Sequence, residues 1–201
     1  MRDVVSRRFG RCLIAAALAA LAGGELAAEQ ATGTLAGVVR IAGRPTANVA
    51  VWIDGAPAKA AARKAPVVLD QRNLRFSPAV LAVPVGTTVV MPNNDRVFHN
   101  VFSFHDGKVF DLGVYPSGAS KTVVFDRPGL SRIFCNIHPD MAAYVIAVES
   151  TLVAVSGAGG AYAIPGVPAG VHTYHAWRPG AAITTGTVEL GRDGAADVQL
   201  P

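Results

Sequence analysis

The chain has 201 residues, of which 51% are hydrophobic and 16% are charged. This length suffices for one or two domains with a sizeable core, and the composition excludes a disordered acidic or basic tail protein. Lys and Arg total 18 against 14 Asp and Glu, a formal net charge of +4, but no basic cluster with interleaved aromatic residues indicates nucleic-acid binding.

The N-terminus has the order of an export signal. Four arginines within residues 1–11 precede the apolar run Cys12–Ala22, and small residues follow as far as Ala28. Secretory signals have this order of basic, apolar and cleavable segments, and the run is shorter than the ~20 apolar residues of a membrane-spanning helix. We expect residues 1–28 to direct the chain to the periplasm and to leave no membrane span in the mature protein. An uncleaved N-terminal anchor is the alternative.

Removal of the signal changes the charge and the cysteine count. It takes away four arginines, Asp3 and Glu25, which leaves 14 basic and 12 acidic residues and a net charge of +2. Cys12 leaves as well, so Cys135 has no partner for an internal disulfide. A single cysteine in an oxidising compartment is explained by a metal site, a reactive thiol or a buried bystander.

Beyond the signal, short apolar runs alternate with turn residues roughly every eight to twelve positions, which predicts an all-β sandwich or barrel. The helix-like composition of residues 56–65 is bounded by Pro57 and Pro66 and predicts a linker. The predicted strands are Thr34–Ile41, Val49–Ile53, Val67–Asp70, Leu74–Ser77, Val80–Pro84, Thr87–Pro92, Phe98–Phe104, Val109–Leu112, Lys121–Phe125, Gly129–Cys135, Tyr144–Glu149, Leu152–Val155, Ala161–Ile164, Gly170–Trp177, Thr184–Leu190 and Ala195–Leu200.

The composition changes near residues 56–66 and again near 149–157. The part between these positions holds Cys135, both methionines that remain after the signal and three of the five histidines. We therefore expect a central domain that carries the chemistry, between β-rich flanks.

The strongest local motif is Cys-x-x-His-x-x-Met, formed by Cys135, His138 and Met141, and a second histidine, His99, lies in an earlier segment. A thiolate, two imidazoles and a thioether are the donors of a mononuclear blue-copper site. The loop from Cys135 to Met141 is short enough to curl back and present His138 and Met141 to one point, and Pro139 stiffens it by fixing its own φ. The sequence therefore favours a copper site.

Other chemistries use some of the same residues. Structural zinc sites favour Cys and His without Met, and a catalytic Cys–His pair leaves His99 and Met141 unused. Each donor also has a bland interpretation: a buried cysteine, a surface or core histidine, or a methionine that fills a gap. Three further residues are interpreted as structural: Met91 as a core residue, and His172 and His175 as strand residues that face opposite sides of a sheet.

The central segment resembles the cupredoxins. The resemblance is carried by Val80–Met91, Asn93–Asp95, His99–Val101, Pro128-Gly129 and the Cys135–Met141 loop, and it covers about Val67 to Val148. The short loop is most similar to that of amicyanin. The resemblance implies a Greek-key sandwich with one type 1 copper ion held by His99, Cys135, His138 and Met141, and it implies that the backbone N–H of Asn100 bonds the Cys sulfur. Ile137 departs from the family, which often has proline there.

The flanks resemble a second family. Gly33–Asp54 and Ser156–Trp177 are similar to the early and late parts of a carboxypeptidase-regulatory-like, Ig-like β-sandwich. The predicted organisation is a signal peptide at 1–28, the first part of the flanking sandwich at 33–56, the cupredoxin domain at 66–149 and the second part of the flanking sandwich at 150–201. This arrangement is similar to bacterial exported proteins labelled "methylamine utilization protein", although no residue shows methylamine chemistry.

These features predict a periplasmic blue copper protein that carries single electrons between transient redox partner proteins. Four matched donors leave no open metal position for a substrate, so we expect no enzymatic activity. Two alternatives stay open: a copper-binding or delivery protein without redox cycling, and a cell-envelope interaction protein with a vestigial copper loop.

Overall fold

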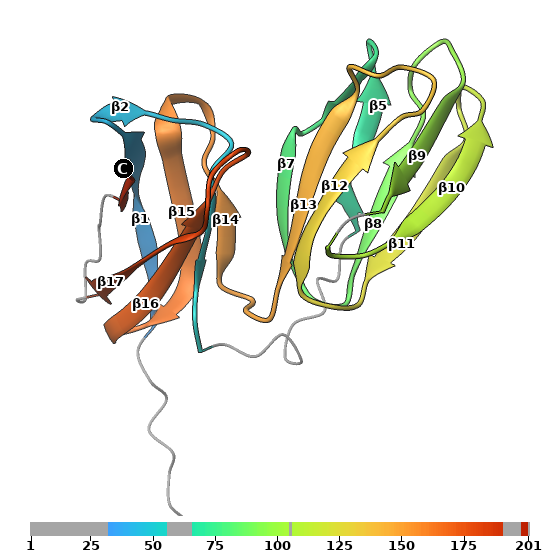
Figure 1. Ribbon diagram of the computed structural model, residues 1–201. Coiled ribbons are helices and arrows are strands. Elements are labelled where there is room, and N and C mark those ends of the chain that lie inside the picture. The colour runs from blue at the N-terminus through green and yellow to red at the C-terminus, as the bar shows by residue number, and fades with distance from the viewer. Residues whose placement is uncertain (1–31, 56–65, 105, 191–197, 201) are drawn as a thin grey trace, which may run out of the picture.

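The computed structural model describes residues 32–55, 66–104, 106–190 and 198–200, and the predicted export signal, the 56–65 linker and His105 lie outside them. The described residues form strands joined by turns, with one 3₁₀ turn at Ala158–Gly160. The predicted all-β class is therefore confirmed (Figure 1). Within the described ranges, no helix is long and apolar enough to span a membrane.

A central sandwich, residues 67–148, contains a five-stranded sheet of order β10-β9-β12-β13-β7 and a three-stranded sheet of order β11-β8-β4, with a short β5-β6 hairpin. Its strands are β4 (Val67–Val68), β5 (Asp70–Arg72), β6 (Arg75–Ser77), β7 (Val80–Pro84), β8 (Thr87–Pro92), β9 (His99–Ser103), β10 (Phe110–Tyr115), β11 (Ser120–Phe125), β12 (Gly129–Phe134) and β13 (Ala142–Val148). Burial alternates along β8 and β11, so one face of each strand points into the core.

A flanking sandwich combines segments from both sides of the central one. One sheet has the order β15-β1-β18 with β2 paired to β1, and the other has the order β14-β3-β16-β17. The strands are β1 (Thr32–Ile41), β2 (Arg44–Pro45), β3 (Ala50–Ile53), β14 (Val153–Val155), β15 (Ala161–Pro168), β16 (Gly170–Trp177), β17 (Thr184–Leu190) and β18 (Val198–Leu200). The sandwich is discontinuous because β1 pairs antiparallel with β15, far along the chain.

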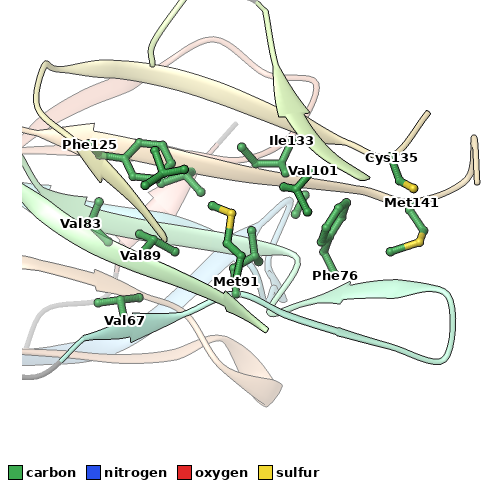
Figure 2. Packing of buried hydrophobic residues seen from close by; sticks show 14 of the residues in the cluster. Val67, Phe76, Val83, Val89, Met91, Val101, Phe125, Ile133, Cys135 and Met141 are labelled. Atoms are coloured by element: carbon green, nitrogen blue, oxygen red, sulfur yellow. The ribbon is translucent and has the colours of Figure 1, made fainter. Parts of the chain in front are cut away.

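Each sandwich has its own hydrophobic core. In the central sandwich, fully buried side chains from both sheets meet, among them Phe125, Met91 and Ile133, and Cys135 and Met141 belong to the same cluster (Figure 2). The prediction that Met91 is a core residue is confirmed, because it is 0% exposed. A separate cluster around Leu35, Val51, Ile53, Tyr162 and Ile164 fills the flanking sandwich.

A third buried cluster lies at the seam between the sandwiches. It combines Trp52 and Trp177 of the flanking sandwich with Val80 and Ile146 of the central one. The Trp177 ring meets the Tyr144 ring edge-on, with centroids 5.4 Å apart. Burial of such aromatic area favours a fixed contact between the two sandwiches.

Several strand bounds differ from the prediction. The predicted strand Val67–Asp70 is broken into β4 and β5, because β4 pairs parallel with β8 whereas Asp70 turns to pair with Ser77 of β6. The two-residue strand β2 was not predicted, and β15 continues beyond the predicted Ala161–Ile164 to Pro168. The domain bounds stay a prediction, since sheet membership does not show which segments fold independently.

The buried tyrosine Tyr115 predicts an alkaline loss of stability. Its hydroxyl accepts a hydrogen bond from Gln71 Nε2 at 2.5 Å and donates to the Met91 carbonyl at 3.0 Å. Burial raises the pKa of Tyr115 to about 12. The stability that the neutral hydroxyl contributes to the folded state is therefore fully present below pH ~10 and is lost as the pH rises towards 12. Phenylalanine does not ionise. Between pH ~10 and ~12 we therefore expect the unfolding free energy of Tyr115→Phe to fall by about 2 kcal/mol less than that of the parent, as measured by urea denaturation at each pH. Parallel pH curves would contradict this.

Candidate metal centre

Strand pairing brings two predicted donors to one end of the five-stranded sheet, on its neighbouring interior strands β9 and β12. His99 is the first residue of β9, and Cys135 directly follows the last residue of β12. The two strands are antiparallel and pair through Phe134 and Phe102. From this pair the start of β9 runs past the end of β12, so His99 lies near Cys135, and both side chains are buried, with His99 at 0% and Cys135 at 4% exposure.

The loop after Cys135 turns back at once. The backbone N–H of Met141 donates to the His138 carbonyl at 3.0 Å, which closes a tight turn. Pro139 occupies the second position of this turn, where its fixed φ is favoured. His138 is left partly exposed while Met141 is buried. Figure 2 shows Met141 at the same end of the core as Cys135.

Three candidate donor atoms form a compact triangle. His99 Nδ1 lies 3.1 Å from His138 Nδ1, and Cys135 Sγ lies 3.9 Å from the first nitrogen and 3.7 Å from the second. The circle through three atoms at these distances has a radius of about 2.1 Å, and metal–nitrogen and metal–sulfur bonds of about 2.0–2.3 Å are typical of imidazole and thiolate ligands. The three residues could therefore hold one ion of this size between them.

A carboxylate orients the first histidine. Asp95 Oδ2 lies 3.2 Å from His99 Nε2, and Asp95 also accepts the backbone N–H groups of Leu74 at 2.7 Å and Arg96 at 2.9 Å. These bonds lower the pKa of Asp95, and the bond from Leu74 has the largest effect. An ionised carboxylate keeps the proton of His99 on Nε2, which leaves the lone pair of Nδ1 for a metal.

A buried asparagine holds the loop that carries Asp95. Asn93 is 0% exposed. Its side-chain amide donates to the carbonyls of Val97 at 2.9 Å and Tyr115 at 3.2 Å, and its oxygen accepts the Asp95 N–H at 3.1 Å. These bonds fix the loop between Asn93 and Val97, so the carboxylate of Asp95 stays in place against the ring of His99.

The structure brings His99, Cys135 and His138 together and buries Met141 at the same end of the core. Their roles as metal ligands, and that of Met141, stay predictions. The side chain of Asn100 donates to Asp111 at 2.8 Å, and the expected bond from its backbone N–H to the Cys sulfur also stays a prediction. The contact of Asp95 with His99 was not predicted, because no signal in a turn sequence indicates which way the carboxylate points.

We expect Asp95→Asn to weaken copper binding by about tenfold or more, the usual effect of changing a group that orients a metal ligand. Asparagine carries no negative charge to hold the proton on His99 Nε2. The measurement is a competition titration with a chelator of known copper affinity. Asp140→Asn is the matched control, since Asp140 is an exposed carboxylate of the metal loop. Equal copper affinities of the two variants would show that Asp95 does not orient His99 for metal binding.

Comparisons with known proteins give structural likenesses only. No protein-family model matches the chain, and no curated protein matches it. The purple cupredoxin of Nitrosopumilus maritimus aligns at 29% identity over 41% of this chain and 99% of its own, with a TM-score of 0.38. Amicyanin of Paracoccus versutus aligns at 22% over 49% and 97%, with a TM-score of 0.39. A copper-containing nitrite reductase of Thermus scotoductus SA-01 aligns at 23% over 55% and 28%, with a TM-score of 0.41. With scores this low, the donor atoms themselves carry the functional proposal.

Proposed function

We propose that this chain is an exported type 1 copper protein that carries single electrons between redox proteins. The observation that carries the proposal is the triangle of His99 Nδ1, His138 Nδ1 and Cys135 Sγ, with edges of 3.1–3.9 Å. Bound copper would supply a one-electron Cu(II)/Cu(I) couple. One soft thiolate and two imidazoles serve both oxidation states.

The surroundings of the donors support copper over zinc and electron transfer over catalysis. Met141 is 1% exposed and lies at the same end of the core as Cys135 (Figure 2), where its thioether, as a weak fourth donor, would suit copper. A structural zinc site would use a fourth Cys or His. We propose no enzymatic activity, because Met141, as the predicted fourth donor, would leave no open position for a substrate.

The polypeptide itself holds the donors in place. His99 is fixed by Asp95, and the His138–Met141 turn is closed by a backbone hydrogen bond. Donors that the fold positions before metal binding would move little when the bound ion changes its charge. A small rearrangement gives a low barrier to electron transfer.

The partly exposed His138 is the proposed electron port. Exposed apolar side chains neighbour the donors in sequence: Val97 and Phe98 precede His99, and Ile137 precedes His138. A small apolar surface and a net charge of +2 for residues 29–201 suit weak, transient docking with little electrostatic steering.

The test is to add Cu(II) to the purified chain from residue 29 onward and to record visible and EPR spectra. We expect an intense blue or purple thiolate-to-copper band that disappears on reduction with ascorbate and returns on oxidation with ferricyanide. A colourless protein that binds Cu(I) would replace this proposal by copper delivery without redox cycling. A protein that holds no copper would leave an envelope interaction protein.

A further inference from the structure

A large cavity opens at the seam between the two sandwiches. Its volume is about 1120 Å³, just above the roughly 300–1,000 Å³ of small-molecule sites. Both sandwiches build its walls, which are mostly apolar and include Trp52, Trp177, Leu130, Ile146, Val148 and Ile183. The cavity is therefore formed jointly by the two sandwiches, and neither forms it alone.

The cavity is separate from the metal centre. Leu130, near the start of β12, lines it, whereas Cys135 follows the end of the same strand. Five residues of strand at ~3.3 Å each put about 16 Å between these two positions. Neither His99 nor His138 lines the cavity. Any ligand here would bind without contact with the copper donors.

The ionisable side chains that line the cavity are all acidic. Asp54 and Glu149 line the cavity and are both exposed, and within the described part of the chain no Lys, Arg or His joins them. Asp54 Oδ2 lies 3.0 Å from His175 Nε2, and His175 Nδ1 lies 3.0 Å from Thr185 Oγ1. The His175 ring stacks on Trp52, with centroids 5.2 Å apart. The carboxylate of Asp54 is thus tied to a wall of the cavity.

We propose that this cavity binds an organic cation with an apolar, ring-sized body. The body packs against the indole and aliphatic walls contributed by Trp52 and Ile146, and the positive group faces the carboxylates of Asp54 and Glu149. Charge complementarity selects this class, because an anion would meet two carboxylates and a neutral ligand would gain nothing from them. The inference is independent of copper.

Both tryptophans of the chain, Trp52 and Trp177, line this cavity. Intrinsic fluorescence therefore reports on this site. The experiment titrates the chain from residue 29 onward with benzyltrimethylammonium, and in parallel with benzyl alcohol and phenylacetate, at constant ionic strength. We expect a saturable fluorescence change with the cation, and binding of the neutral and anionic probes that is at least about fivefold weaker. Equal affinity for all three probes would overturn the proposal.

Charge variants test the role assigned to the two carboxylates. Glu149→Gln and Asp54→Asn together should weaken binding of the cation by about fivefold and leave binding of benzyl alcohol unchanged. Glu189→Gln is the matched control, because Glu189 is an exposed carboxylate of β17 outside the lining. Glu149→Gln alone changes an exposed side chain, so it keeps the test valid if the double variant does not fold. Unchanged affinity in Glu149→Gln and in a folded double variant would overturn the proposal.

The copper-free Cys135→Ser variant separates this inference from the proposed function. It should bind benzyltrimethylammonium with the affinity of the parent chain. Loss of cation binding in this variant would contradict the independence of the two sites, whereas cation binding with no blue copper spectrum in the parent would contradict the proposed function alone.

Discussion

Replacing Cys135 by serine is expected to abolish the intense visible band of the copper-loaded protein and to weaken copper binding by at least about a hundredfold. The band needs a thiolate, and a serine hydroxyl stays protonated and is a poor ligand at neutral pH. Cys135 Sγ is one corner of the donor triangle, 3.7 and 3.9 Å from the two imidazole nitrogens, and loss of a donor must cost more than the 10–100-fold of an orienting group.

Two histidine variants serve as a matched pair for this experiment. His138→Gln removes a second corner of the triangle and should also eliminate the blue band. His172→Gln should retain it, since His172 lies on β16 of the flanking sandwich, where its Nε2 contacts the Pro168 carbonyl at 2.7 Å. A blue spectrum that survives in Cys135→Ser would show that the sulfur does not bind the ion.

The sequence predicted the parts of the site that lie in one short loop. Cys135 and His138 are so close in the chain that a single turn brings them together, and spacing alone indicates this. Met141 follows at the same end of the core, and its role as a donor stays a prediction. The inclusion of His99 depended on resemblance, because the pairing of β9 with β12 that brings it near Cys135 is seen only in the folded chain. The support from Asp95 could not be predicted, because its carboxylate is held by the N–H of Leu74, which is close only in the folded chain.

The seam was also missed, although the sequence carried a signal for it. Ala50–Ile53 and Val145–Val148 are unbroken apolar runs in which every residue is buried. An antiparallel sheet with one face in water alternates apolar and polar residues, so such runs indicate that both faces of the strand are covered. The second face of β13 is covered by the flanking sandwich through Ile146 and Val148. Which layer would cover it depends on tertiary packing, which the run itself does not encode.

Truncating Phe125 to alanine is expected to lower the unfolding free energy by about 3–5 kcal/mol, as deletion of a buried aromatic ring generally does. Phe125 is 0% exposed at the end of β11 and meets the Phe110 ring edge-on, with centroids 6.2 Å apart. The alanine leaves a cavity between the two sheets that close packing cannot fill without strain. Because small domains have only about 5–15 kcal/mol of stability, urea denaturation of the copper-free protein should show a much earlier midpoint.

Phe98→Ala is the matched control, because Phe98 is 58% exposed and its truncation should change the unfolding free energy by less than about 0.5 kcal/mol. Phe125 lies at the opposite end of the labelled core from Cys135 and Met141 (Figure 2). The folded Phe125→Ala protein should therefore keep the copper spectrum of the parent, since the donors are held by Asp95 and the His138–Met141 turn and not by this ring. A destabilised protein whose spectrum also changes would mean that the donor triangle depends on packing throughout the core. An unchanged midpoint would mean that the two sheets close over the lost ring.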